Sequence, residues 1–237
     1  MNRPEFRELA PYRFTSIAGG FEVSGNPDLV SATIQSYDAR WEWFPGSRDV
    51  IAASVFYKHF DTPIEPVLIQ SVARVLTYQN AQSARNMGLE LEFRKSFDPF
   101  TVILNYAYID SQITLAEGSI QTNDTRPLVG QPDHVGNVVL EWLNVSTSTN
   151  LRLLLNYSGE QVAFAGANLL PDVIEAPRTT YGFAFIQGFR LFKMDWNVKL
   201  SGENLSDESW DFTQGGETWR TWHPGRKFGL SVGLTVF

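Results

Sequence analysis

Residues 87–111, "MGLELEFRKSFDPFTVILNYAYIDS", contain two alternating runs of side chains with a short segment between them. Every second residue of both runs is large and apolar: Met87, Leu89, Leu91 and Phe93 in the first, and Phe100, Val102, Leu104, Tyr106 and Tyr108 in the second. Successive side chains of a β-strand point to opposite faces. The stretch therefore predicts two strands, each with one apolar and one polar face, joined by a turn at "SFDP".

The same period of two extends along most of the chain. Further alternating runs occupy residues 36–45, 50–58, 134–142, 151–158, 180–187, 192–204 and 228–236. In the first of these, Tyr37, Ala39, Trp41 and Trp43 alternate with charged residues. We therefore predict nine strands, and we expect Met1–Ala10 to form the end of a tenth.

The predicted connections alternate between short and long. "PGSRD", "SFDP" and "NVSTSTN" are short, whereas residues 61–83, 112–132, 161–177 and 206–223 form long irregular segments. Bacterial outer-membrane barrels join their strands by short periplasmic turns on one side and long extracellular loops on the other. The alternation predicts an antiparallel transmembrane β-barrel wall, with the final strand ending on the periplasmic side.

Composition excludes several classes of protein. A net charge of −7 argues against nucleic acid as a partner, because such binding depends on clustered Lys and Arg. The absence of cysteine excludes disulfides and Cys-ligated metal centres. No run of about 18 apolar residues predicts a membrane helix, and the first residues lack the apolar segment of a signal peptide.

No residue pattern predicts a catalytic, cofactor or metal site. His59, His134 and His223 share no short spacing with one another, and the acidic group Asp207, Glu208 and Asp211 lacks the regular spacing of a calcium loop. No motif typical of hydrolases, metalloproteases or phosphate-binding loops is present. We therefore expect a protein that is not an enzyme.

A soluble antiparallel sandwich would also alternate with a period of two. The mixture of both charge signs with small residues on the polar face favours the barrel. Trp, Tyr and Phe near the strand ends point the same way, because amphipathic rings concentrate at the two membrane interfaces.

Short strings in a fixed order resemble the C-terminal barrel portion of TonB-dependent outer-membrane receptors. They are "RPEFREL", "GNPDL", "YDARWEWFP", "VFYKHFDTPIE", "NMGLELEFRK", "YAYIDSQI", "RPLVGQPDHVGNVVLEW", "SGENLSDESW" and "PGRKFGLSVGLTVF". The resemblance implies a barrel of about 22 strands around an N-terminal plug, which imports scarce nutrients with energy relayed by TonB. Residues 1–237 would be the C-terminal part of that barrel, without plug or signal peptide. We expect such a fragment to be unable to transport alone.

The resemblance also suggests roles for individual residues. The expected lumen-facing residues are Asp38, Arg40, Glu42, Glu90, Glu92, Arg94 and Lys199. The expected loop contacts for an unknown small-molecule ligand are Trp210, Trp219 and Trp222, although these rings would equally serve to pack the loop. Two other functions remain open: a complete small outer-membrane barrel with a structural or adhesive role, and a soluble carbohydrate-binding β-sandwich.

The resemblance further implies that the final strand carries the signal for the barrel-assembly machinery. Its apolar row comprises Phe228, Leu230, Val232, Leu234 and Val236, and the terminal aromatic is Phe237. Phe237 is one residue out of phase with this row, and a shift of one residue moves a side chain to the other face. Either the chain bends after Val236, or Val236 takes the place of the aromatic. The expected surroundings are outer-membrane lipid, in a Gram-negative-type bacterium.

Overall fold

The computed structural model describes residues 3–15, 22–69, 74–115, 119–123 and 125–235. These residues form one helical turn and seventeen strands. The elements are α1 (Phe6–Leu9), β1 (Arg13–Thr15), β2 (Glu22–Ser24), β3 (Thr33–Trp43), β4 (Val50–Asp61), β5 (Ile64–Ile69), β6 (Val75–Asn80), β7 (Ser83–Phe97), β8 (Phe100–Thr114), β9 (His134–Asn144), β10 (Thr149–Ser158), β11 (Gln161–Gly166), β12 (Val173–Glu175), β13 (Arg178–Leu191), β14 (Met194–Glu203), β15 (Trp210–Gln214), β16 (Glu217–Trp222) and β17 (Lys227–Thr235).

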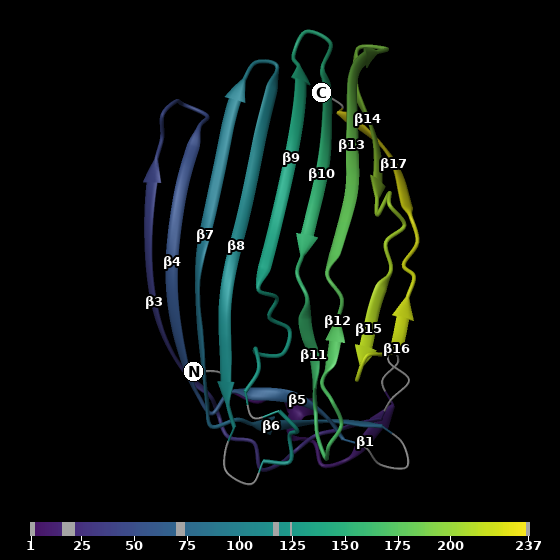
Figure 1. Ribbon diagram of the computed structural model, residues 1–237. Coiled ribbons are helices and arrows are strands. Elements are labelled where there is room, and N and C mark those ends of the chain that lie inside the picture. The colour runs from purple at the N-terminus through teal and green to yellow at the C-terminus, as the bar shows by residue number, and fades with distance from the viewer. Residues whose placement is uncertain (1–2, 16–21, 70–73, 116–118, 124, 236–237) are drawn as a thin grey trace.

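The nine long strands form one antiparallel sheet, the main sheet, in the order β17-β14-β13-β10-β9-β8-β7-β4-β3. Short turns join four neighbouring pairs, β3–β4, β7–β8, β9–β10 and β13–β14, and all of these turns lie at one end of the sheet, called the turn end. The long connections emerge at the opposite end, called the loop end (Figure 1). The number of long strands and their short-long alternation match the sequence prediction.

The register places the predicted apolar residues in rows that run across several neighbouring strands of the main sheet. One row runs from Trp41 through Ala53, Leu91 and Tyr106 to Gly136, because each is paired with the next. Another runs from Leu140 through Leu153 to Phe183. The last strand continues the rows, since Leu200 pairs with Leu230 and Val198 with Val232. All these side chains share one side of the sheet, the apolar face, and the alternate residues form the polar face.

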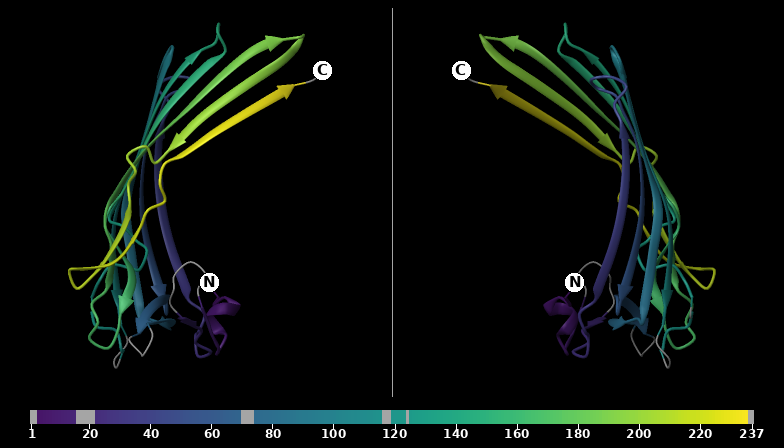
Figure 2. Two further views of the ribbon diagram at one scale, coloured as in Figure 1. Left: turned by 90° about the vertical axis from the view of Figure 1, so that its right-hand side faces the viewer. Right: turned by 90° about the vertical axis from the view of Figure 1, so that its left-hand side faces the viewer.

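The main sheet does not close. Its described edges are β3 and β17, and the side views show that the upper parts of β13, β14 and β17 lean away from the other strands (Figure 2). A closed small barrel is therefore not the observed architecture. Among the described residues, no helix has the length and apolar character needed to cross a membrane.

The long connections are more regular than the sequence suggested. Three of them, together with the segment before β3, supply the strands of a second sheet, the loop sheet, in the order β1-β2-β6-β5-β11-β12-β15-β16. Two of its contacts are parallel, β2 with β6 and β5 with β11, and join segments far apart in the chain. Sequence reasoning missed these short strands because the sheet depends on contacts between different connections, namely β2 with β6, β5 with β11 and β12 with β15. The sheet lies at the loop end (Figure 1).

Two further expectations were wrong. The described part of Met1–Ala10 is not a strand but contains α1, where the Glu8 carboxylate accepts the backbone N–H of Glu5 in a capping box. The strand expected over residues 192–204 begins two residues later, because Phe192 and Lys193 form the turn between β13 and β14. Both have positive φ, 53° and 61°, as the tight two-residue hairpin turn requires.

Candidate functional site

The apolar face is exposed, and the types of side chain on it change along the strands from the loop end to the turn end. Tyrosines gather toward the loop end, at Tyr37, Tyr57, Tyr106, Tyr108, Tyr157 and Tyr181, and each is at least partly exposed. Leu and Val side chains occupy the middle, and Trp41, Trp43, Phe97, Phe100 and Phe189 lie toward the turn end. Two aromatic belts around an aliphatic band are typical of a surface that crosses a bilayer.

The height of the band is appropriate for a membrane. Along β8, Phe100 and Tyr108 are eight residues apart, which is about 27 Å of strand at a rise of about 3.4 Å per residue. Barrel strands tilt by about 35–45°, so this length corresponds to roughly 20 Å of membrane thickness between the ring positions.

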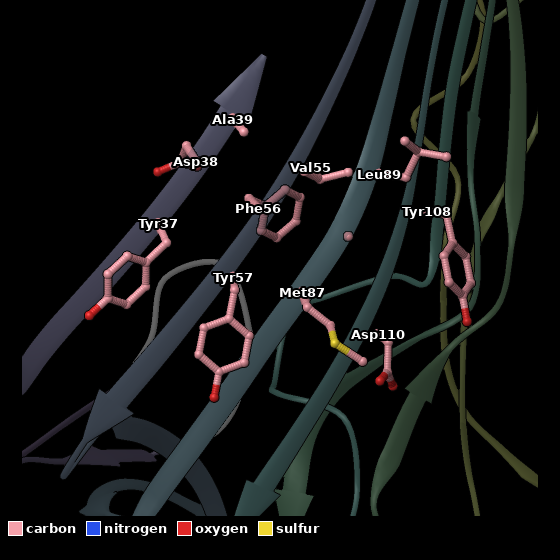
Figure 3. A pocket seen from close by; sticks show the side chains of 11 residues that line it. Tyr37, Asp38, Ala39, Val55, Phe56, Tyr57, Met87, Leu89, Tyr108 and Asp110 are labelled. Atoms are coloured by element: carbon pink, nitrogen blue, oxygen red, sulfur yellow. The ribbon is translucent and has the colours of Figure 1, made fainter. Parts of the chain in front are cut away.

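A shallow groove of about 570 Å³ crosses the apolar face near its loop end. Figure 3 shows two rows of side chains along it, which the register defines: Tyr37, Tyr57, Met87 and Asp110, and then Ala39, Val55, Leu89 and Tyr108. The groove is lined almost entirely by apolar atoms. It therefore suits an aliphatic chain better than a polar ligand.

The polar face carries ion pairs both within a strand and between strands. The Arg40 guanidinium donates to Glu42 at 2.5 Å and to Glu92 at 2.7 Å, and it reaches the Ser54 hydroxyl at 3.3 Å. On the middle strands, the Glu141 carboxylate accepts from Asn150 at 2.6 Å and from Arg152 at 3.2 Å. These charges compensate one another on a surface that water can reach, so they fit pairing better than acid–base catalysis.

The structure places the predicted lumen-facing residues on this one face but in two regions. Asp38, Arg40, Glu42, Glu90, Glu92 and Arg94 lie on β3 and β7. Lys199 lies on β14, between Ile186 and Ser231, several strands away. Near Lys199 the polar face is built from small residues, among them Gly182, Ala184 and Ser201, and a pocket of about 600 Å³ opens there.

The three predicted loop tryptophans belong to the hairpin of β15 and β16, where they mainly pack the loop. Trp210 meets Trp222 edge to face with ring centroids 4.7 Å apart, and the Arg178 guanidinium lies 4.3 Å from the Trp210 ring. The ring of Trp219 meets those of Phe164 and Phe212 edge to face, with ring centroids 5.8 and 6.2 Å apart. Trp222 is 50% exposed and leaves the most ring surface for a ligand.

The acidic group Asp207, Glu208 and Asp211 does not converge. Hydrogen bonds from the hydroxyls of Thr221 and Ser209 hold the pKa of Asp211 below its usual value. Within the described parts of the chain, no group of three or more His, Asp and Glu side chains is placed to hold a metal ion.

At the turn end, Asp49 links two hairpins. Its carboxylate accepts from the Lys95 ammonium at 2.6 Å and from the Ser96 backbone N–H at 3.0 Å. These two hydrogen bonds, the one from Lys95 first, hold the pKa of Asp49 below its usual value. Asp49 therefore joins the β3–β4 turn to the end of β7.

Sequence reasoning missed one buried charge cluster at the loop end. Arg126, Glu65 and Asp172 have side chains that are only 4%, 3% and 7% exposed. They come from three different connections, so no local spacing marks them as partners. The only available signal is that buried charges are paired, which requires knowing that they are buried.

The comparisons with known proteins agree with this geometry. The family model "TonB dependent receptor-like, beta-barrel" matches residues 1–205. No curated protein matches the chain.

Solved receptor structures share the fold at low sequence identity. A mutant of the ferric enterobactin receptor of Pseudomonas aeruginosa, in complex with enterobactin, is similar with a TM-score of 0.63 and 16% identity, over 97% of this chain and 36% of that one. The ferric yersiniabactin uptake receptor of Yersinia pestis is similar with a TM-score of 0.60 and 18% identity, over 86% of this chain and 30% of that one. The FrpB iron transporter of Neisseria meningitidis is similar with a TM-score of 0.59 and 12% identity, over 86% of this chain and 31% of that one. This chain thus spans about a third of these receptors.

The family is one of outer-membrane transporters and not of enzymes. With a family match over residues 1–205 and a two-faced antiparallel sheet, the chain belongs to the β-barrel family of TonB-dependent receptors of the Gram-negative outer membrane.

Proposed function

We propose that this chain forms the C-terminal part of the barrel wall of a receptor that imports a scarce nutrient across the outer membrane. The observation that carries the proposal is the continuous division of the main sheet into an apolar and a polar face. The apolar face would contact lipid. The polar face, with Asp38, Arg40, Glu42, Glu90, Glu92, Arg94 and Lys199, would line the lumen.

The orientation follows from the connections. The turn end would face the periplasm and the loop end, with the loop sheet, would lie outside the cell. Phe228, Leu230, Val232 and Leu234 lie on the apolar face of β17, which supports their proposed role in recognition by the barrel-assembly machinery. Val236 and Phe237, the other two residues of that signal, lie outside the described residues.

The working barrel would need more strands. In hydrocarbon, the unpaired backbone groups along β3 and β17 would each cost several kcal/mol. The main sheet has nine strands, and each runs antiparallel to its neighbours. Its first and last strands, β3 and β17, therefore run in the same direction. Only an odd number of added strands can close this sheet with antiparallel pairs throughout. Two copies of the chain would leave parallel junctions, so we assign the added strands to the rest of the receptor.

The class of cargo is a further proposal. The similar solved structures include receptors named for ferric enterobactin and ferric yersiniabactin. We favour a ferric siderophore over a vitamin or glycan, with import powered by TonB through a plug domain. Trp222 is the best placed of the three loop tryptophans to contact the cargo, because it is the most exposed.

The test compares residues 1–237 alone with the same residues joined to the remaining receptor strands. We expect only the joined protein to give a heat-modifiable, protease-resistant band in lipid. A stable monomeric barrel from residues 1–237 would contradict the requirement for added strands. Uptake of radiolabelled ferric siderophores by cells with and without the intact gene, under iron limitation, tests the cargo, and unchanged uptake of every siderophore tried would remove that class.

A further inference from the structure

Residues 126–131, here called the strap, lie on the polar face of β7 and β8 at the loop end. The backbone N–H of Leu128 donates to the Ser111 hydroxyl at 3.2 Å, and the Asn86 amide donates to Gln131 at 3.0 Å. Asn86 and Ser111 are paired across the two strands on the polar face. They are only 8% and 9% exposed, so the strap covers them.

Apolar packing holds the strap on both sides. Leu128 packs against the buried cluster of Ala81, Ala84 and Ile113. The next residue, Val129, packs against a separate buried cluster formed by Val67, Ala165 and Ala167 of the loop sheet region. The strap therefore fills the angle between the main sheet and the loop sheet, on the side that faces the proposed lumen.

Arg126 fastens the beginning of the strap. Its guanidinium donates to the two Glu65 oxygens at 3.2 and 2.6 Å and to the Gln121 side chain at 2.5 Å. Glu65 also accepts the backbone N–H of Val129 at 3.1 Å. Asp172 lies 4.0 Å from the Arg126 Nε atom. Removing one member of such a buried pair leaves an uncompensated charge, which strongly destabilises the local structure.

The same cluster ties the strap to two other connections. Asp172 accepts the Gly166 backbone N–H at 2.7 Å and the Asn123 amide at 2.6 Å. The Gly130 N–H donates to the Val162 carbonyl at 2.8 Å. Segments of the β5–β6, β8–β9 and β11–β12 regions are thus held together by one guanidinium and two carboxylates.

We propose that the strap is an inward-folded gate that narrows the extracellular mouth of the barrel, and that Arg126 and Glu65 are its latch. This inference rests on the proposed function, because it takes the polar face as the lumen wall. The strap must be displaced before a large molecule can pass along β7 and β8. The latch keeps it closed, and loss of the latch opens it.

The experiment uses the absence of cysteine from the chain. Ser111→Cys is introduced beneath the strap in the complete receptor, and intact cells are treated with a membrane-impermeant fluorescent maleimide. We expect slow labelling with Arg126 present. Labelling should become roughly tenfold faster or more with Arg126→Met, because exposure of a covered site follows the free energy of local opening. Arg126→Lys, which keeps the charge and loses the two-pronged contact, should be intermediate.

Two controls keep the outcome interpretable. Arg152→Met removes a partly exposed pair with Glu141 on the same face and should leave the labelling rate unchanged. Leu169→Cys, at a site 91% exposed, should label rapidly in every background. If heat-modifiability is lost in every variant, the barrel proposal itself fails, and if Leu169→Cys fails to label in intact cells, the proposed orientation fails. If the barrel is intact but Ser111→Cys labels as fast as Leu169→Cys, or Arg126→Met changes nothing, the gate is refuted.

Discussion

At the scale of single residues, this protein uses charge in two different ways. On the polar face, Arg40 and Arg152 form pairs that water reaches, and such pairs contribute little to stability because water screens them. At the ends of the strands, Asp49 and Arg126 are largely enclosed and join segments far apart in the chain. The second group matters more for structure, because an enclosed charge without its partner is costly.

Asp49 provides the residue-scale prediction. Its pKa is lowered in the folded protein, so it stabilises the fold fully above the ordinary carboxyl pKa of about 4, and this stabilisation is lost as the pH falls through the folded-state pKa. We expect Asp49→Asn to lower the urea midpoint of the lipid-embedded receptor at pH 7, and the difference from the parent to shrink progressively below about pH 4.

Asp98→Asn is the matched control for this measurement. Asp98 pairs with Arg48 at the same end of the sheet, but the two side chains are 84% and 62% exposed. We expect its urea midpoint to equal that of the parent at both pH values. An Asp49→Asn midpoint that is unchanged at pH 7 would show that the contacts with Lys95 and Ser96 do not stabilise the fold.

At the scale of elements, each long strand is specified by its alternation, and neighbouring strands agree in register. Leu153 pairs with Leu140 and Phe183 on the apolar face, whereas Leu154 pairs with Val139 and Gly182 on the polar face. The two residues are adjacent and chemically identical, yet they face the two proposed solvents. This makes them a sensitive test of which face contacts lipid.

The element-scale prediction compares Leu153→Arg with Leu154→Arg in the complete receptor. An arginine on the lipid face near the bilayer midplane costs about 2–4 kcal/mol, whereas one on the lumen face is tolerated. We expect Leu153→Arg to reduce the heat-modifiable band strongly and Leu154→Arg to leave most of it. Equal losses, or the reverse order, would contradict the assignment of the faces.

At the scale of the whole molecule, the two sheets have different roles. The main sheet provides the wall, and the loop sheet gathers the long connections into one assembly at a single end (Figure 1). The parallel contact between β5 and β11 and the Arg126 cluster hold this assembly together. The two ends of the molecule are therefore chemically and structurally different, as expected for a protein with an outside and a periplasmic side.

The whole-molecule prediction concerns this polarity. Single cysteines at Leu169, at the loop end, and Val145, in the turn between β9 and β10, are 91% and 78% exposed. In intact cells, an impermeant maleimide should label Leu169→Cys and not Val145→Cys. After permeabilisation of the outer membrane both should be labelled. Labelling of Val145→Cys alone in intact cells would invert the proposed orientation.

The sequence by itself determined the main sheet. Alternation with a period of two marks which strands exist and which side chains share a face, and the short turns fix which strands pair as hairpins. It therefore predicted the nine long strands, the apolar rows from Tyr37 to Leu234, and the separate face that carries Arg40, Glu92 and Lys199. These features are local, since each depends on residues within one strand or one hairpin.

Only the tertiary structure decided what happens at the loop end. The strands β5, β6, β11 and β12 have short, weakly patterned sequences. They form two hairpins, and the parallel pairing of Val67 in β5 with Ala165 in β11 joins these hairpins from positions about 100 residues apart in the chain. Arg126, Glu65 and Asp172 look like ordinary surface residues until folding buries them together. The main sheet is thus predicted by local periodicity, whereas the loop sheet and the latch depend on contacts between distant segments, which no local pattern predicts.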